Sequence, residues 1–213
     1  MTAIVGAIDG NDVVIGADSA LTDGWARTAL IHTRDCKAFL LRHGTVAVGL
    51  CGAVRPVQLI RSFDPPPRHA DDEDTTAYLT GTFVDHLRSH LRRAGALKTE
   101  NGLESAPETG GLIGCAGRLF HLETDLSCWE HAEPYAAHGH GYLFALGALR
   151  ALSVRGVAGE DLVRAALDAT AHHDATVRPP FVIVRLKGSP QPATTAASVS
   201  SGTEPDTGPK GTG

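Results

Sequence analysis

The sequence predicts an α+β fold in which two antiparallel sheets carry helices on their outer sides. Three observations lead to this class. The first 51 residues contain two consecutive β-hairpin patterns, two later regions carry apolar residues at helical spacing, and an apolar run ending at residue 186 predicts a final strand. This order of strands, helices, strands, helices and a strand is typical of layered α+β domains.

Both hairpin patterns consist of apolar runs that flank turn-forming residues. In the first pattern, residues 3–8 and 13–17 flank Asp-Gly-Asn-Asp, which is a strong turn sequence. In the second pattern, residues 36–42 and 45–51 flank a His-Gly turn. The arms of the first hairpin are apolar on both faces, which predicts a sheet that is covered on two sides.

The hairpin registers bring polar residues to the open ends of the hairpins. If the turn of the first hairpin is centred between Gly10 and Asn11, Thr2 pairs with Ser19, and Asp18 is the residue next to Ser19. The same rule places Lys37 and Gly52 at the open end of the second hairpin. A charged residue within a buried run needs a partner, so the economical arrangement pairs Asp18 with Lys37. In the alternative, both side chains point to solvent at the ends of their strands.

Four helices are predicted, in two pairs. The first pair covers residues 54–63, which end before three prolines, and residues 75–94, whose first turn follows the acidic residues 71–74. The second pair covers residues 142–152 and 160–172. Apolar residues of the 75–94 helix fall near i, i+4 spacing and form one stripe: Tyr78, Leu79, Phe83, Leu87 and Leu91.

The other segments are predicted as a third hairpin, a last strand and loops. Residues 112–115 and 119–122 flank an Ala-Gly turn and predict the hairpin, and residues 181–186 predict the strand. Residues 95–110 are polar and rich in glycine, which predicts a long loop. Residues 21–35 lack a sustained period, so irregular or short extended structure is expected there.

Length and composition predict one globular domain followed by a tail. A chain of 213 residues, 42% of them hydrophobic, is long enough to bury a sizeable core. We expect this domain to span residues 1–187. Residues 188–213 are mainly Ser, Thr, Gly, Pro and Ala, which predicts a disordered tail.

Charge and hydropathy argue against several kinds of partner. A formal net charge of -5 gives no electrostatic footprint for nucleic acid or for an anionic membrane. No apolar run reaches the roughly 18 residues that a membrane span needs. The N-terminal residues lack the basic region of a signal or transit peptide, so a cytoplasmic protein is expected.

Neither a cofactor nor a metal is predicted. The cysteines at positions 36, 51, 115 and 128 are scattered and lack Cys-x-x-Cys spacing. Several histidines and one aspartate invite a metal interpretation, but their spacing fits no established ligand set: His131, His138, His140, His172, His173 and Asp174.

Five segments, in this order, resemble proteasome β-type subunits, which are N-terminal nucleophile hydrolases. They are Thr2-Ala3-Ile4-Val5-Gly6, Ile15-Gly16-Ala17-Asp18-Ser19, Lys37, Val48-Gly49-Leu50-Cys51-Gly52, and Gly139-His140-Gly141 with the helix that follows. The pattern is especially similar to the bacterial ATP-dependent threonine peptidase of this family, which also starts with Met-Thr. The resemblance covers roughly residues 2–187.

The resemblance implies a proteasome-like four-layer αββα sandwich with a threonine peptidase site. Removal of Met1 would expose Thr2 as the nucleophile, and its own α-amine would be the general base. Lys37 would favour the alkoxide-like form of Thr2, and Asp18 would hold Lys37 in place. The backbone N–H of Gly52 would donate to the oxyanion.

The resemblance also implies partners. The substrate would be a peptide or an unfolded protein, the chains would assemble into a closed homo-oligomeric ring, and a ring ATPase would act with it. Leu50 and residues 35–39 are expected to line the pocket for the side chain that precedes the scissile bond, which predicts a partly apolar pocket.

Two positions bear on the supporting part of the site. His140 occupies the place of the family's turn serine, which helps to hold the N-terminal amine. Asp174 matches the aspartate of the family's Asp-x-x-Ser motif, whereas Val177 occupies the position of the serine in that motif. We therefore assign supporting roles to His140 and Asp174.

Two other functions stay open on the sequence alone. A stand-alone amidohydrolase of the same fold would act on a small amide without a ring or an ATPase. A catalytically inactive scaffold would keep the fold and lose turnover, and His140 is the residue that favours this alternative. Particle size distinguishes the ring from the stand-alone form, and an acylating probe directed at Thr2 distinguishes an enzyme from a scaffold.

Overall fold

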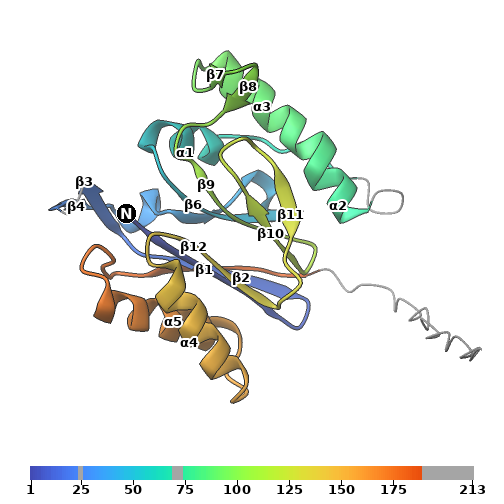
Figure 1. Cartoon of the computed structure of the whole chain (residues 1–213). Coiled ribbons are helices and arrows are strands. Elements are labelled where there is room, and N and C mark those ends of the chain that lie inside the picture. The colour runs from blue at the N-terminus through green and yellow to red at the C-terminus, as the bar shows by residue number, and fades with distance from the viewer. Residues whose placement is uncertain (24–25, 69–73, 189–213) are drawn as a thin grey trace, which may run out of the picture.

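A computed structural model describes residues 1–23, 26–68 and 74–188 of the chain. It combines helices with antiparallel sheets, which confirms the predicted α+β class (Figure 1). The helices are α1 (Val54–Arg61), α2 (Thr75–Tyr78), α3 (Val84–Arg93), α4 (Tyr142–Ser153) and α5 (Gly159–His173), with short 3₁₀ turns at Thr33–Asp35 and Arg42–Gly44. Within the described ranges, no helix is long and apolar enough to cross a membrane.

Two main sheets form the centre of the molecule, and every strand pair in them is antiparallel. The first sheet has the order β12 (Tyr135–Gly139), β1 (Ala3–Asp9), β2 (Asp12–Ala17) and β13 (Val182–Leu186). The second has the order β11 (Cys128–Glu130), β10 (Arg118–Leu122), β9 (Gly110–Cys115), β6 (Val46–Cys51) and β5 (Ala38–Leu40). Two small hairpins are β3 (Ala20–Asp23) with β4 (Ala26–Leu30), and β7 (Lys98–Glu100) with β8 (Leu103–Ser105).

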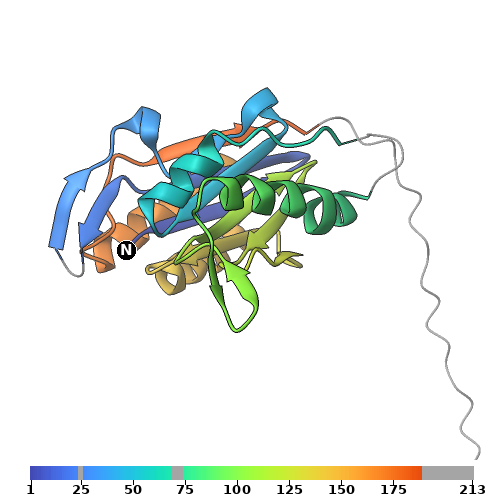
Figure 2. The same cartoon turned by 90° about the horizontal axis from the view of Figure 1, so that it is seen from above.

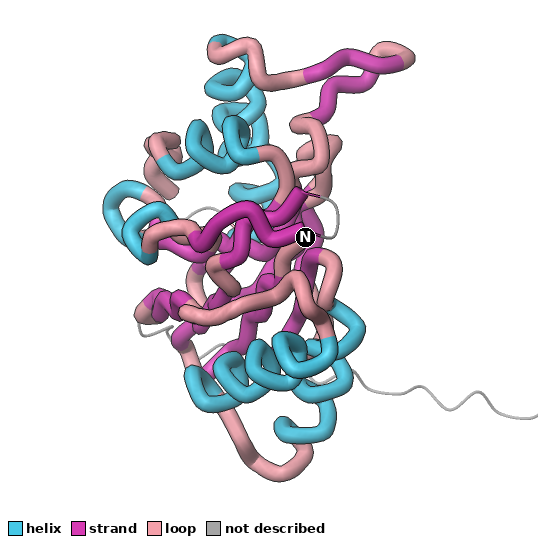
Figure 3. Tube along the Cα trace, turned by 90° about the vertical axis from the view of Figure 1, so that its left-hand side faces the viewer, coloured by secondary structure: helices cyan, strands magenta, loops and turns pink. Residues whose placement is uncertain are grey.

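Apolar side chains join the two sheets to each other and join each sheet to its helices. Because side chains alternate along a strand, β1 sends Ile4 toward the second sheet, where Leu112 lies in the same core cluster. Val14 packs with α4 and α5 on the outer face of the first sheet, and Ile113 packs with α1 and α3 on the outer face of the second. Figure 3 shows these helices on opposite sides of the strands, and Figure 2 shows α1 and α3 in front of the strands in the view from above.

Both hairpin registers agree with the prediction. In the first hairpin Ile4 pairs with Ala17, which continues the register toward Thr2 and Asp18 at the open end. In the second hairpin the Leu50 N–H donates to the carbonyl of Lys37 over 2.9 Å, the pairing expected for a turn centred on His-Gly. The ends of both hairpins are therefore where the sequence placed them.

The helix predicted at residues 75–94 is present, with one irregularity. Asp74 caps its start, because Oδ2 accepts hydrogen bonds from the N–H groups of Thr76 and Ala77 at 3.2 and 3.4 Å. A π-helical segment, Leu79–Phe83, then joins α2 to α3. The predicted apolar stripe is buried along its whole length. The acidic residues 71–73 lie outside the described residues.

Several segments differ from the prediction. The long loop predicted at residues 95–110 is wrong, since β7 and β8 form a hairpin there. Its turn is Asn101-Gly102, with φ angles of 52° and 79°, and this left-handed pair is a frequent two-residue hairpin turn. The strands β11 and β12 were not predicted. β12 has no apolar alternation of its own, and it is stabilised by pairing with β1 along the edge of the first sheet.

Two further expectations concern less regular parts of the chain. Residues 21–35, expected to be irregular or short extended structure, contain most of the β3–β4 hairpin. Of the tail expected at residues 188–213, only Gly188 lies within the described residues. The Gly188 N–H donates to Asp12 at 3.0 Å, so the end of the described chain is held to the start of β2.

Candidate active site

The four residues assigned to catalysis lie at the ends of four strands. Thr2 precedes β1, Asp18 follows β2, Lys37 precedes β5 and Gly52 follows β6. The two hairpins belong to different sheets, and their apolar faces share one core cluster. Face-to-face packing of these sheets brings the open ends of the hairpins to the same edge of the molecule.

Lys37 joins the two hairpins through its ammonium group. Nζ lies 2.8 Å from Thr2 Oγ1 and 2.8 Å from Asp18 Oδ1. All three residues are buried, with exposures of 6% for Thr2, 0% for Asp18 and 7% for Lys37. The solvent-facing alternative for Asp18 and Lys37 is therefore wrong, and the ion pair expected from the registers is present.

The Asp18 carboxylate is held by backbone groups as well as by Lys37. Oδ1 accepts from the N–H of Ala3 at 3.1 Å, and Oδ2 accepts from the N–H of Ala20 at 2.9 Å. The Arg178 N–H lies 3.5 Å from Oδ2. These donors and the ammonium compensate the buried negative charge, so the carboxylate is a fixed anchor for the lysine side chain.

Burial changes the acidity of Lys37. Loss of solvation lowers the pKa of Lys37 from its ordinary value, and the Asp18 carboxylate acts in the opposite direction without cancelling this effect. The ammonium is consequently more acidic than that of an exposed lysine. Its hydrogen bond to Thr2 Oγ1 is therefore well suited to stabilise negative charge on that oxygen.

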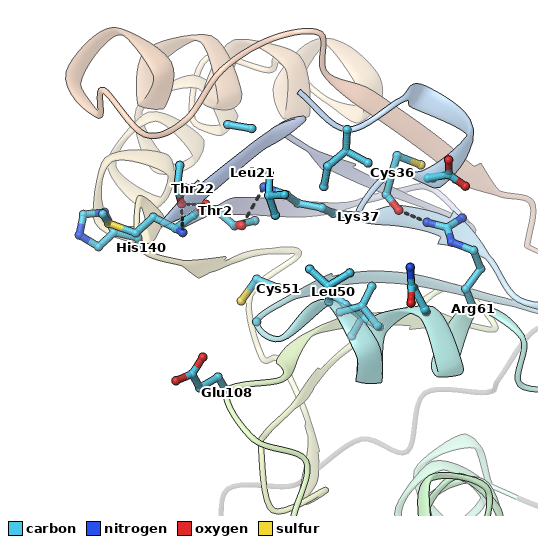
Figure 4. A pocket seen from close by; sticks show the side chains of 18 residues that line it. Thr2, Leu21, Thr22, Cys36, Lys37, Leu50, Cys51, Arg61, Glu108 and His140 are labelled. Carbon is cyan, nitrogen blue, oxygen red and sulfur yellow. Dashed lines mark hydrogen bonds between the residues drawn. The ribbon is translucent and has the colours of Figure 1, made fainter. Parts of the chain in front are cut away.

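A cavity of about 430 Å³ opens beside Thr2 and Lys37 (Figure 4). Its apolar lining includes Leu21, Ile31, Leu50, Val54 and Val57. Polar groups also line it, among them Asp35, Gln58 and Arg61. The predicted Leu50 and residues 35–37 are in this lining, whereas the predicted Ala38 and Phe39 are buried and do not line it. The Arg61 guanidinium lies 3.9 Å from the centroid of the Phe39 ring. The cavity thus combines an apolar wall with a polar end.

Met1 lines the same cavity and is still joined to Thr2. Its α-ammonium donates to Thr22 Oγ1, and the Thr22 hydroxyl lies 3.4 Å from the Met1 carbonyl oxygen. In this form of the chain the nitrogen of Thr2 belongs to a peptide bond. A free α-amine at Thr2 requires that Met1 be removed.

Gly52 occupies a backbone position that only glycine can fill. Its φ angle is 116°, in the left-handed region, and a Cβ atom there would collide with the backbone carbonyl of Glu108. The same atom would lie 2.8 Å from Thr109 Cα. Close passage of two backbone segments therefore forms this rim of the cavity, which Gly52 lines together with Thr2.

The supporting residues His140 and Asp174 contact each other. His140 Nδ1 lies 2.8 Å from Asp174 Oδ2, while Asp174 Oδ1 accepts from the N–H and the hydroxyl of Thr176 at 2.9 and 2.6 Å. Burial would raise the pKa of Asp174, but the hydrogen bonds from Thr176 and His140 lower it below its usual range. His140 also lines the cavity, so this pair and Thr2 belong to one site.

Part of the lining was not predicted. Met1, Thr22, Val57, Arg61 and Glu108 come from separate segments that only tertiary packing brings together. Cys51 lies next to Gly52 in the lining, and burial raises the pKa of its thiol to about 11, so this cysteine is protonated at neutral pH.

The histidines considered as metal ligands lie in three places. His131 and His138 both contact His121, whose ring centroid lies 5.5 and 4.7 Å from theirs. His140 contacts Asp174, and His172 and His173 lie exposed at the end of α5. Over residues 1–23, 26–68 and 74–188, no group of three or more His, Cys, Asp or Glu side chains is arranged to hold a metal ion.

Comparison with known proteins relates this geometry to a fold. No protein-family model matches the sequence. No curated protein sequence matches it either. Solved structures do match. One is BPH of Thiobacillus denitrificans in complex with epoxomicin, which is 20% identical, with a TM-score of 0.71 over 88% of this chain and 100% of the other.

Two further solved structures are similar. Eukaryotic HslV from Trypanosoma brucei is 20% identical, with a TM-score of 0.61 over 87% of this chain and 99% of the other. Anbu, an ancestral beta-subunit from Yersinia bercovieri, is 15% identical, with a TM-score of 0.54 over 86% of this chain and 81% of the other. The resemblance to proteasome-type N-terminal nucleophile hydrolases is therefore confirmed, and at these identities it shows that the chain has their fold.

Proposed function

We propose that this protein is a threonine peptidase of the N-terminal nucleophile type, with a four-layer αββα sandwich over residues 1–187. Its nucleophile is Thr2, after removal of Met1. The observation that carries the proposal is the position of Lys37 Nζ, which lies 2.8 Å from both the Thr2 hydroxyl and the buried Asp18 carboxylate. A hydroxyl beside a clamped and unusually acidic ammonium is the arrangement that activates a nucleophilic oxygen.

The reaction begins with proton transfer from the Thr2 hydroxyl to the α-amine of the same residue. An unperturbed α-amine has a pKa of about 8, so an appreciable fraction is neutral at pH 7. Lys37 favours negative charge on Oγ1 and disfavours a second positive charge on the amine. The oxygen attacks the carbonyl carbon of the substrate, the leaving amine takes the proton, and water later hydrolyses the ester on Thr2.

Gly52 supports the oxyanion that forms during the attack. We assign its backbone N–H as the donor to this oxygen, because Gly52 follows β6 and lines the cavity together with Thr2. A donor of this kind contributes on the order of 3 kcal/mol to transition-state stabilisation. A glycine without a side chain lets the substrate backbone approach closely.

The cavity supports a preference for substrates with a sizeable apolar side chain before the scissile bond. Leu50, Val54 and Val57 form an apolar wall that such a side chain would cover. Substrate backbone would lie beside Leu21 and Thr22 on one side and Gly52 on the other. The substrate class is accordingly peptides or unfolded protein segments.

Assembly into a homo-oligomeric ring belongs to the same proposal. α4 leaves apolar side chains exposed that a neighbouring subunit would cover: Tyr142, Leu143 and Phe144. The resemblance implies a ring ATPase as the partner that delivers unfolded chains, and the expected cytoplasmic location agrees with such a partner. Light scattering of the purified protein tests the ring, since a monomer of 22.3 kDa would contradict it.

A covalent probe tests the nucleophile. The intact mass is measured before and after incubation with epoxomicin, the compound bound in the similar Thiobacillus structure. Loss of Met1 and one adduct on Thr2 are expected, and the variant Thr2→Ala should give no adduct. A trimmed chain that does not react with epoxomicin or with a smaller acylating agent would favour an inactive scaffold. Reaction with the small agent only, in a monomer, would favour the stand-alone amidohydrolase.

A further inference from the structure

Three imidazoles form a cluster where an edge of the first sheet meets the second sheet. His138 lies on β12 of the first sheet, His121 lies on β10 of the second, and His131 directly follows β11. His138 Nδ1 lies 2.9 Å from His121 Nε2, and the ring centroid of His131 lies 5.5 Å from that of His121. None of these side chains has a role in the mechanism proposed above.

Within the described residues, one carboxylate faces the three imidazoles. Glu123 Oε1 lies 3.4 Å from His121 Nε2, and the same carboxylate acts on His138 and on the Cys51 thiol of the cavity. Glu133, on the loop after His131, is exposed. The strand positions that pair with His121 and His138 carry no titratable side chain: Ile4 of β1, Leu112 of β9 and Trp129 of β11. Positive charge on all three imidazoles would therefore exceed the negative charge beside them.

The imidazoles are neutral at neutral pH. Burial lowers the pKa of His121 to about 4, and the neighbouring His138 and His131 act in the same direction. Burial also lowers the pKa of His131 and of His138, although Glu123 acts to raise that of His138. In the described part of the chain, His131 Nε2 is buried and has no hydrogen-bond partner, so a proton on this nitrogen would meet no acceptor.

The hydrogen bond between His121 and His138 requires a neutral ring. One of the two nitrogens donates and the other accepts, whereas both nitrogens of an imidazolium are donors. Two protonated rings would therefore face each other with two donors and two positive charges in place of a hydrogen bond of 2.9 Å. Acid thus turns this contact between the sheets from attraction into repulsion.

His138 belongs to the backbone segment that holds Thr2. β12 is an edge strand of the first sheet and pairs with β1, where Gly139 lies opposite Ala3. A Cβ atom on Gly139 would collide with the Thr2 carbonyl oxygen, and the Gly141 N–H donates to the same oxygen at 3.4 Å. A displacement of β12 therefore moves the backbone that borders Thr2.

His138 also lies against the segment that forms the rim at Gly52. A Cβ atom on Gly110 would lie 3.3 Å from His138 Nε2. Gly110 follows Thr109, whose Cα would lie 2.8 Å from a Cβ atom on Gly52. The imidazole cluster thus adjoins both backbone segments that border the cavity at Thr2 and Gly52.

We propose that this cluster is an acid-sensitive switch: protonation of His121, His131 and His138 separates β12 from β10 and displaces the backbone beside Thr2. The nucleophile then loses its position in acid. Its effect on reactivity rests on the proposed function, whereas the separation of the strands does not. Return to neutral pH removes the protons, and the strands close again.

The size of the effect follows from the two forms of the cluster. In the open form the imidazoles have an ordinary pKa of about 6.5, so at pH 5.5 each ring is about ten times more often charged than neutral. In the closed form burial keeps the rings neutral. Each imidazole therefore raises the ratio of open to closed protein by up to about tenfold between pH 7.5 and 5.5. The closed form is fully stable above about pH 6.5 and loses stability as the pH falls from there toward 4.

Hydrogen exchange tests the separation of the strands. Deuterium uptake of peptides that cover residues 135–141 is measured at pH 5.5 and 7.5 and corrected for the intrinsic exchange rate, with peptides of β2 as the reference. We expect the protection of residues 135–141 to fall by on the order of tenfold or more at pH 5.5, while β2 stays protected. The protection should return when the protein is brought back to pH 7.5.

Four variants test whether the imidazoles cause this change. His138→Gln and His131→Gln each remove one titrating ring and keep a polar side chain, so their loss of protection should be smaller than that of the wild-type protein by up to about tenfold. Glu123→Gln removes the counter-charge and should make the loss larger. His172→Gln, at the exposed end of α5, is the matched control and should behave like the wild-type protein. Circular dichroism at pH 7.5 verifies that all variants are folded.

Labelling of Thr2 tests the effect on the site. Processed protein, with Met1 loss verified by mass, is reacted with a peptide β-lactone at both pH values. Protonation of the α-amine slows all variants alike in acid. The additional slowing that comes from the switch should be smaller in His138→Gln than in His172→Gln by up to about tenfold.

Each result decides part of the proposal. Equal protection of residues 135–141 at both pH values in the wild-type protein would overturn the switch, and so would a loss that His138→Gln and His131→Gln do not reduce. Strands that separate while His138→Gln and His172→Gln slow equally in labelling would refute the effect on Thr2. Wild-type protein that forms no adduct at pH 7.5 would contradict the proposed function, and the exchange measurements would still decide the switch.

Discussion

Lys37 donates a hydrogen bond of 2.8 Å from Nζ to Thr2 Oγ1, across the junction between the two main sheets. The two residues are 35 positions apart in the chain and directly precede strands of different sheets. Their contact depends on the face-to-face packing of the sheets. The candidate nucleophile therefore acquires its activating charge only in the folded protein.

Replacing Lys37 by methionine should remove probe labelling of Thr2. The variant keeps an unbranched side chain one heavy atom shorter and loses the charge that favours negative Oγ1, so we expect labelling to slow by at least about 100-fold. Lys98→Met, at an exposed position of β7, is the matched control and should label at the wild-type rate. Labelling of both variants is followed by intact mass, at a temperature below the melting temperature of each. Equal labelling of the two variants would contradict the role of Lys37.

Asp18 and Lys37 should behave as one unit. Asp18→Asn removes the anchor of the ammonium, so it is expected to slow labelling by an amount similar to that of Lys37→Met. The double variant should then be no slower than the slower single variant, because groups that act together lose their effect together. Labelling rates of the four proteins form a double-mutant cycle. Independent, multiplicative losses would show that Asp18 acts through some other group.

Gly49 should be important for packing between the sheets. A Cβ atom at this position would lie 2.5 Å from Ile4 Cγ2 and 2.7 Å from Ile15 Cγ2, so Gly49→Ala overpacks the inner layer. We expect a loss of about 1–3 kcal/mol in the free energy of unfolding. Gly147→Ala is the control, because Gly147 lies at an exposed position of α4 and nothing lies within 4 Å of a Cβ atom there. We expect Gly147→Ala to raise the free energy of unfolding by up to about 1 kcal/mol, because alanine favours a helix more than glycine does. Urea unfolding that shows the opposite order would refute the packing argument.

Asp12 should make stability depend on pH in the acid range. Its carboxylate accepts hydrogen bonds from Lys187 at 2.8 Å, from the N–H of Gly188 at 3.0 Å and from Arg185 at 3.0 Å, and these lower its pKa to about 2. The folded-state pKa lies below the unfolded value of about 3.9. The stabilisation is therefore fully present above about pH 4 and is lost as the pH falls through 2.

The variant Asp12→Asn checks this window. Its melting temperature should be below that of the wild-type protein at pH 7, and the difference should shrink between pH 4 and pH 2. Asp168→Asn, at an exposed position of α5, should show no such convergence. A difference for Asp12→Asn that stays constant down to pH 2 would mean that the ionised carboxylate is not what stabilises this edge.

The predictable parts of the fold are those whose signals are local. The turn sequences predicted the registers of both N-terminal hairpins, and the periodic apolar stripe predicted the helix that contains Leu87 and Leu91. The hairpin at Asn101-Gly102 could also have been predicted, since Asn-Gly is a strong two-residue turn signal. β12 could not, because its stability comes from pairing with β1, which is more than 100 positions away in the chain.

The candidate site divides in the same way. Thr2, Asp18, Lys37 and Gly52 could be identified because hairpin geometry places each of them at an open end. The pairing of His140 with Asp174 could not be read from spacing, since the two residues belong to different elements 34 positions apart. The cavity residues Thr22, Arg61 and Glu108 carry no pattern at all. Side chains that meet only through packing leave no periodic signal in the chain.

The sequence by itself determined where the N-terminal hairpins and the long helices form. It also determined the registers of both N-terminal hairpins, and with them the residues at the open ends. These follow from turn chemistry and apolar periodicity, which act over a few residues. Only the tertiary structure decided that the two hairpins meet, that Lys37 bridges Thr2 and Asp18, and that the His140–Asp174 pair adjoins the same cavity. Those contacts result from burial of the apolar faces of two sheets against each other, a long-range effect in which every strand takes part.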